Sequence, residues 1–223
     1  LLASLQQSQA DVICLQELQL ETITTTTTTT TTQGEEAPPS TTTTYAYRLP
    51  AWLTPMTERY HLQLPPLAAL DTMAVRNARV LGQRVAIVCG ILVQKGLHYR
   101  TRNHDDTTTC VSVCLRLPSG IAAVTNEVVV TCLHLDAKEE LKRVKQLTGG
   151  LQRAKQFFFE NNANDDDDDF RQSLSTILVG DLNTELWPGS CCRAFLTTTA
   201  AEADDAAMVR ECAAALRLQN GVV

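Results

Sequence analysis

Short apolar runs divide this chain into five predicted β-strands. We place them near residues 11–16, 85–93, 110–116, 128–134 and 176–180. The run at 85–93 is apolar at almost every position, which is typical of a central strand buried on both faces. These runs are shorter than a typical helix, so they predict a sheet-rich core.

Two longer segments have helical periodicity. Leu141, Val144, Leu147 and Leu151 recur every three or four residues, which predicts a helix over 136–159 that Gly149 and Gly150 weaken or kink. Its other side carries basic residues, which we interpret mainly as a solvated face. Another helix is expected over 200–218, with Met208, Cys212 and Leu216 on one face. The alternation of strands and helices is consistent with a layered α/β domain.

Polar side chains follow three of the predicted strands. Glu17 follows the first, His134 ends the fourth, and Asp181 and Asn183 follow the fifth across Gly180. Side chains at i and i+2 of an extended chain point the same way, so Asp181 and Asn183 would project together. The alternative is an Asp-Asn turn that merely closes a strand. Active sites often form where several strand ends meet the same loops.

These residue types suit phosphoester chemistry. A carboxylate can orient and deprotonate a nucleophile, an amide can hydrogen-bond a developing oxyanion, and Gly180 leaves room for a close backbone approach. Glu17 is a candidate ligand for a hard cation.

Three motifs carry a family resemblance. Asp11-Val-Ile-Cys-Leu-Gln-Glu17, Cys132-Leu-His-Leu135 with Arg143-Val-Lys-Gln146, and Gly180-Asp-Leu-Asn183 are similar, in this order, to motifs of the endonuclease/exonuclease/phosphatase superfamily. They most resemble its nocturnin and carbon-catabolite-repressor-4-like deadenylase branch, and the tyrosyl-DNA phosphodiesterase branch is also close.

The resemblance implies a role for each matching residue. Glu17 falls on the ligand of a catalytic divalent ion, magnesium or alternatively manganese. Asp181 falls on the residue that activates or positions the attacking water, and Asn183 on the residue that orients this water and contacts the phosphate. His134 falls on the residue that stabilises the scissile phosphate or assists departure of the leaving group. Arg143 and Gln146, an Arg-x-x-Gln pair, are implied to support the site.

The resemblance also implies a fold, a DNase I-like four-layer α/β sandwich of two mixed β-sheets flanked by helices. We expect residues 1–223 to form one partial domain, with low-complexity insertions at 24–44 and 161–169 interpreted as mobile loops. Relatives carry an upstream Asn and a late Asp-His pair. Only sixteen residues precede Glu17 and no His follows Asp181, so the chain looks truncated at both ends.

Further departures from the family motifs, and the composition of the chain, say less about its function. Cys132 and Leu133 stand where many relatives have Asn and Thr, which affects the expected rate and substrate preference. Without the five aspartates at 165–169, the formal charge of −6 becomes −1, so charge indicates little about partners. The eight cysteines lack metal-ligand spacing. A disulfide framework should be smaller and more regular, so we expect a reducing, intracellular compartment. No apolar run reaches eighteen residues, so we expect no membrane span.

The sequence therefore predicts a magnesium-dependent phosphodiesterase that acts on a nucleic acid or nucleotide. Two alternatives remain open: a small-molecule phosphatase on the same fold, and a catalytically impaired relative that serves as a binding or scaffold module. The segment Tyr45-Ala-Tyr-Arg48 resembles substrate-facing residues of relatives, although we favour ordinary packing for it.

Overall fold

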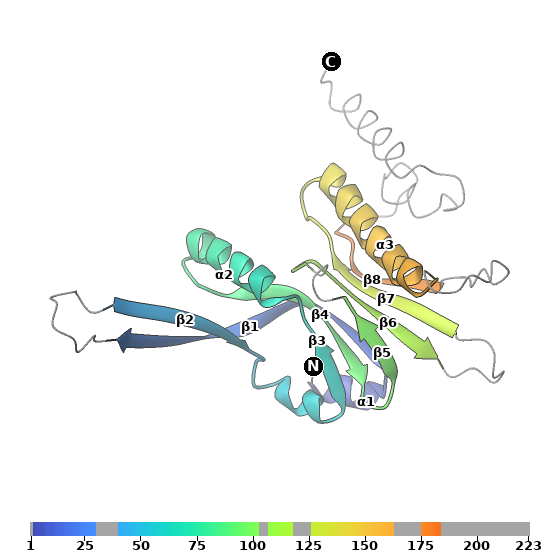
Figure 1. The fold of residues 1–223 in the computed structure, drawn as a ribbon, viewed down its shortest axis with the longest axis horizontal. Helices are drawn as coiled ribbons and strands as arrows, with labels where there is room; N and C mark the ends of the chain where they lie inside the picture. The colour runs from blue at the N-terminus through green and yellow to red at the C-terminus, as the bar shows by residue number, and fades with distance from the viewer. Residues whose placement is uncertain (1, 30–39, 103–106, 118–125, 163–174, 184–223) are drawn as a thin grey trace, which may run out of the picture.

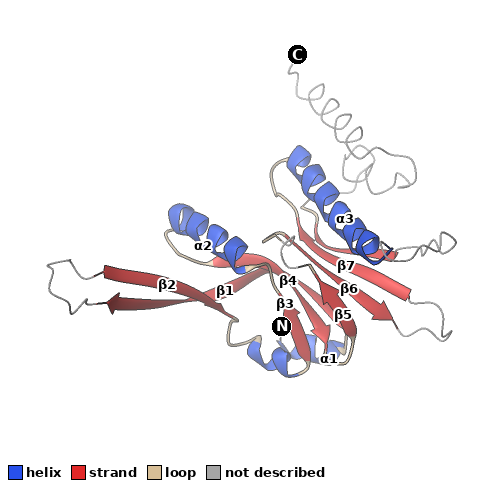
Figure 2. Cartoon of the chain, in the orientation of Figure 1, coloured by secondary structure: helices blue, strands red, loops and turns tan. Residues whose placement is uncertain are grey.

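Two four-stranded sheets form the centre of the molecule in the computed structural model (Figure 1). The structure describes residues 2–29, 40–102, 107–117, 126–162 and 175–183. The helices are α1 (Leu2–Ser8), the 3-10 helix η1 (Thr54–Glu58), α2 (Leu67–Leu81) and α3 (Glu140–Asn162). Figure 2 shows them outside the strands, with α2 and α3 over different sheets.

The first sheet is antiparallel, in the order β2-β1-β4-β3. Its strands are β1 (Val12–Thr29), β2 (Ser40–Arg48), β3 (Tyr60–Gln63) and β4 (Ala86–Gln94). The first half of β1 pairs with β4, whereas its second half pairs with β2. The β1/β2 hairpin consequently extends beyond the rest of the sheet (Figure 1).

The second sheet is mixed, in the order β5-β6-β7-β8. Its strands are β5 (His98–Thr101), β6 (Cys110–Leu117), β7 (Asn126–His134) and β8 (Ser175–Asp181). Strands β7 and β8 run parallel, with α3 between them in the sequence, as a parallel pair requires. The expectation of two mixed sheets is thus wrong for the first sheet, whose described pairings are all antiparallel.

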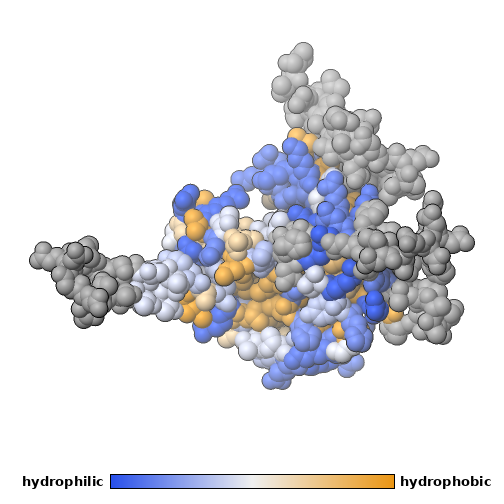
Figure 3. All heavy atoms as spheres, viewed as in Figure 1, coloured by the Kyte–Doolittle hydropathy of each residue, from blue (hydrophilic) through white to orange (hydrophobic). Residues whose placement is uncertain are grey.

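Three apolar layers hold these elements together. One lies between the first sheet and α2, where Leu70 and Ala74 meet β1 and β4. The second lies between the sheets and includes Cys89, Ile91 and Cys132. The third lies under α3, where Leu133, Leu135 and Leu147 pack together. Figure 3 shows polar residues over α3 and apolar ones near the centre of this face, over the strands.

All five predicted strands are present; four have slightly different ends, whereas the strand predicted over 11–16 continues to Thr29. The predicted helix over 136–159 is also present, although it begins at Glu140 and continues unbroken past Gly149 and Gly150. A Cβ on Gly150 would lie 3.0 Å from Leu133, so this glycine allows α3 to pack closely on β7. The predictions did not include α1, α2, β3 or β5.

The threonine tracts correct another prediction. Strand β1 continues through Thr29 and β2 begins at Ser40, with threonines paired opposite threonines, so these parts of 24–44 are not loops. Threonine is β-branched and favours extended backbone, which a composition-based interpretation overlooks.

Some predicted features lie outside the described residues. These are residues 30–39 of the first insertion, residues 163–169 of the second, and the helix expected over 200–218. Within the described residues, no helix is long and apolar enough to cross a membrane.

Candidate active site

Two strand ends and a bulge within β1 bring His134, Asp181 and Glu17 to one edge between the sheets. His134 and Asp181 are directly opposite each other at the ends of β7 and β8, so their side chains share a face of the sheet. That face is turned toward the first sheet, because Cys132, two residues before His134, packs between the sheets. From the first sheet, Glu17 places its Oε1 atom 3.8 Å from Nε2 of His134.

A β-bulge in β1 presents Glu17 at this edge. The pairing of β1 with β4 shifts between Leu15 and Leu18, and Glu17 has a left-handed φ of 53°. Cys14 packs between the sheets before the bulge, whereas Leu18 packs on the outer layer after it. Bulges re-aim side chains in this way, and a non-glycine residue at positive φ is strained. The Glu17 side chain remains 72% exposed.

Asp181 and Asn183 form a turn at the end of β8. Oδ1 of Asp181 accepts a 2.8 Å hydrogen bond from the backbone N–H of Asn183, whose φ is 49°. The expectation that both side chains project from an extended strand is therefore wrong, because the strand ends at Asp181. The Asn183 amide instead donates a 2.8 Å hydrogen bond to the carbonyl oxygen of Leu135, the residue after His134. The alternative of an Asp-Asn turn is therefore correct, and Asp181 still lies opposite His134.

Gly180 allows β8 to approach β7. Its φ of 156° is rare for residues with a Cβ, and a Cβ there would lie 1.8 Å from the carbonyl oxygen of Leu133. The sequence suggested a close backbone approach at Gly180, and the structure identifies β7 as the backbone concerned. The glycine thereby sets the register that places Asp181 opposite His134.

Arg143 and Gln146 hold the backbone just beyond His134. Nη1 of Arg143 donates a 2.9 Å hydrogen bond to the carbonyl oxygen of Asp136, and Oε1 of Gln146 accepts a 2.7 Å hydrogen bond from its N–H. Arg143 also forms an ion pair with Glu140 at 2.7 Å. Both side chains therefore support the site by holding the backbone of Asp136, and neither bonds to Glu17, His134 or Asp181 in these contacts.

Asp136 is a member of this region that sequence analysis did not identify. Its Oδ1 atom accepts hydrogen bonds from the N–H groups of Lys138 and Glu139, each at 2.9 Å, and its other oxygen pairs with Lys142. The Lys142 ammonium, followed by the two backbone donors, holds the pKa of Asp136 well below its usual range. An Asp shortly before a predicted helix is a capping signal that could have revealed it.

We expect Gln146→Met to destabilise the protein by about 1 kcal/mol, because the partly buried N–H of Asp136 loses its acceptor. Gln146→Glu keeps an acceptor at the same reach and is the matched control. Urea unfolding of both variants measures the difference. Equal stability of the two would show that the Gln146 hydrogen bond does not hold this backbone.

The oxygen donors at this edge fit magnesium. Glu17 and Asp181 are exposed carboxylates, and magnesium commonly binds one or two carboxylates while keeping several waters. Within the described ranges, no three His, Cys, Asp or Glu side chains converge closely enough to enclose a metal ion.

The aromatic residues of β2 have packing roles. Tyr45 lies against the guanidinium of Arg84, with 3.6 Å between its ring centroid and Cζ. The Tyr47 hydroxyl donates a 2.6 Å hydrogen bond to Asp71 of α2. Burial, followed by this contact, raises the pKa of Tyr47 to about 12. Arg48 pairs with Glu21 on β1 at 2.6 Å. These contacts favour ordinary packing for the segment 45–48.

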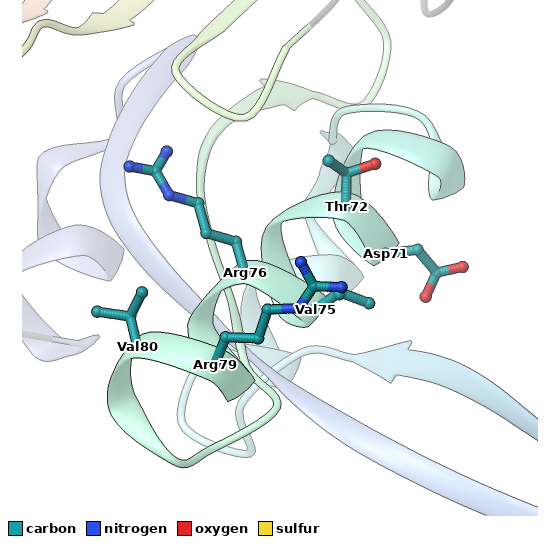
Figure 4. Close-up of a pocket in the computed structure, with 6 residues that line it drawn as sticks. All are labelled: Asp71, Thr72, Val75, Arg76, Arg79 and Val80. Carbon is teal, nitrogen blue, oxygen red and sulfur yellow. The ribbon is translucent and has the colours of Figure 1, made fainter.

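A hollow of about 480 Å³ lies along α2, away from the strand ends (Figure 4). All its lining residues belong to this one helix, and among them Arg76, Arg79 and Val80 lie along its second half. None of the predicted site residues lines it.

The described residues thus define a class of site, a carboxylate, an imidazole and a second carboxylate at one edge of two packed sheets.

No family model matches the chain, and no curated protein matches it. A solved structure of TDP2 from Caenorhabditis elegans is similar over 82% of this chain, with 13% identity and a TM-score of 0.36. This chain covers 40% of the length of that one. A similarity of this degree assigns neither a family nor an activity.

Proposed function

We propose that this chain is part of a divalent-metal-dependent phosphodiesterase that hydrolyses a phosphoester of a nucleic acid or nucleotide. One observation carries the proposal. Glu17, His134 and Asp181 are far apart in the sequence, yet the strand pairing and the 3.8 Å contact gather them at one exposed edge. A packing role does not require three ionisable side chains at the same edge of a fold.

Each side chain has a distinct task in this proposal. Asp181 orients and deprotonates the attacking water, with Asn183 beside it to hold the turn and contact the phosphate. His134 donates a hydrogen bond to the phosphate as charge develops there. Glu17 holds magnesium, or manganese in its place, which when bound would neutralise phosphate charge.

We also propose a superfamily, and a branch within it, for this enzyme. The three ordered motifs resemble the endonuclease/exonuclease/phosphatase superfamily, and the layers α2, first sheet, second sheet and α3 suit its DNase I-like sandwich. Within it, we favour the deadenylase-like branch, with the motifs at Glu17, His134 and Asp181 as the reason. An intracellular enzyme without a membrane span is the corresponding expectation.

Glu17→Gln in the intact protein tests the metal site. We expect the magnesium concentration for half-maximal activity to rise by at least about tenfold, the lower end seen for residues that only support a ligand. Added magnesium should partly restore turnover. A magnesium titration of the phosphodiesterase rate measures both effects.

Glu21→Gln is the matched control, because Glu21 lies on the same strand and pairs only with the exposed Arg48 among its described contacts. It should leave the magnesium dependence unchanged. An unshifted titration for Glu17→Gln would contradict metal binding by Glu17.

A further inference from the structure

Three thiols meet between the sheets directly behind the candidate active site. Cys14 lies on β1, Cys89 on β4 and Cys132 on β7, and none is in a disulfide. All three side chains belong to the apolar cluster between the sheets, with Cys89 and Cys132 fully buried in it and Cys14 packed against it. The Cys132 thiol also donates to the carbonyl oxygen of Leu15 at 3.4 Å and accepts from Nε2 of Gln16 at 3.3 Å. Cys132 is therefore held against β1, the strand that carries Cys14.

A cavity gives small molecules access to this cluster. It has a volume of about 370 Å³, opens between the sheets and is lined mainly by apolar side chains of β1, β6, β7 and β8, with Cys14 among them. Cys14 is only partly buried, whereas Cys89 and Cys132 are fully buried. Cys14 lines the cavity, whereas Cys89 and Cys132 do not, so Cys14 is the thiol that an entering oxidant meets first.

The two sulfurs are placed for a bond across the sheets. Their strands lie on opposite sides of the inter-sheet layer, and the Cys132 sulfur lies 3.4 Å from the carbonyl oxygen of Leu15, the residue after Cys14. Disulfides between the two sheets of a sandwich are an established arrangement.

We propose that Cys14 and Cys132 form a reversible disulfide that ties β1 to β7 behind the active-site edge, with a hydroperoxide as the oxidant. The Cys14 sulfur attacks a peroxide oxygen, the O–O bond breaks, and the thiol proton leaves with the departing oxygen. The Cys132 sulfur then attacks the resulting sulfenic acid, the S–S bond forms, and water departs with the second thiol proton. The thiols lose two electrons, which reduce the peroxide.

The bond would alter the active site because it is close to two of its residues. Cys14 precedes Glu17 by three positions, and Cys132 precedes His134 by two. A disulfide joins sulfurs at about 2 Å, closer than any hydrogen-bond contact, so β1 and β7 must shift. Displacements of about 1 Å can lower rates by about 100-fold. This loss of activity rests on the proposed function, whereas formation of the disulfide does not.

Peptide mapping of the intact protein tests the disulfide without any activity assay. Trypsin releases Cys14, Cys89 and Cys132 in separate peptides, 1–48, 85–95 and 117–138, each with a single cysteine. After treatment with hydrogen peroxide and alkylation of the remaining thiols, we expect a linked 1–48/117–138 pair that dithiothreitol separates. The neighbouring Cys132 thiol and burial raise the pKa of Cys14, so the link should form over minutes to hours.

Two variants sharpen the test. Cys89→Ser should retain the link, whereas Cys14→Ser should lose it and keep its phosphodiesterase rate in peroxide. A linked 85–95/117–138 pair, or three alkylated peptides after peroxide treatment, would overturn the proposal even if a variant failed to fold. A linked wild-type protein with no phosphodiesterase activity in its reduced form would contradict the proposed function and leave the disulfide standing.

Discussion

Asp181→Asn should lower metal-dependent phosphodiester cleavage by about 100- to 10,000-fold, the range for removal of a general base. The substitution keeps the side-chain oxygen that accepts the Asn183 N–H, so the turn at the end of β8 should survive. The expected loss is therefore chemical. Turnover of wild type and variant at saturating magnesium measures it, with thermal unfolding as the check on folding.

Glu58→Gln is a suitable control, since Glu58 is exposed in η1, away from the strand ends. It should retain the wild-type rate. If Asp181→Asn turned over as fast as this control, Asp181 would not be the residue that activates water.

Gly180→Ala should destabilise the protein by about 3 kcal/mol or more, beyond the usual range for a single substitution at an exposed position. Two costs add: the backbone conformation at φ 156° and a Cβ placed 1.8 Å from the Leu133 carbonyl oxygen. Relief requires β8 to move away from β7, which would also displace Asp181 from His134. Urea unfolding measures the stability.

Gly96→Ala separates these two costs. Gly96 also has a positive φ, +99°, but a Cβ there meets nothing within 4 Å, so only the conformational cost of about 1 to 2 kcal/mol applies. Equal losses at the two positions would mean that close packing of β8 on β7 contributes nothing at Gly180.

Much of the fold could be predicted because its physical cause is local. A strand between two packed layers is apolar at nearly every position, and β4 and β7 show this directly in the sequence. Leu147 and its neighbours repeat at helical spacing because one face of α3 packs on β7. The short strands β3 and β5 are mostly polar and depend on their partners, so no local pattern indicates them.

The arrangement of the site was less predictable. Motif order indicated Glu17, His134 and Asp181 as candidates, but not the bulge that presents Glu17, because positive φ at a glutamate leaves no mark in the sequence. The turn at Asn183 and the cross-strand hydrogen bond to Leu135 depend on which strand lies beside β8. Likewise, the hydrogen bonds of Arg143 and Gln146 to Asp136 form only after α3 packs beside β7. Pairing between distant segments determines these details, and a single sequence does not record it.

Magnesium-dependent hydrolysis by the intact protein tests the central claim most directly. A suitable panel is poly(A) RNA, abasic DNA, 5′-tyrosyl DNA and NADP(H), assayed with magnesium, with EDTA, and with manganese added back. We predict cleavage of at least one substrate with magnesium, none with EDTA, and recovery with manganese. A folded protein that cleaves none of them, or cleaves equally well in EDTA, would contradict a metal-dependent phosphoesterase site at Glu17, His134 and Asp181.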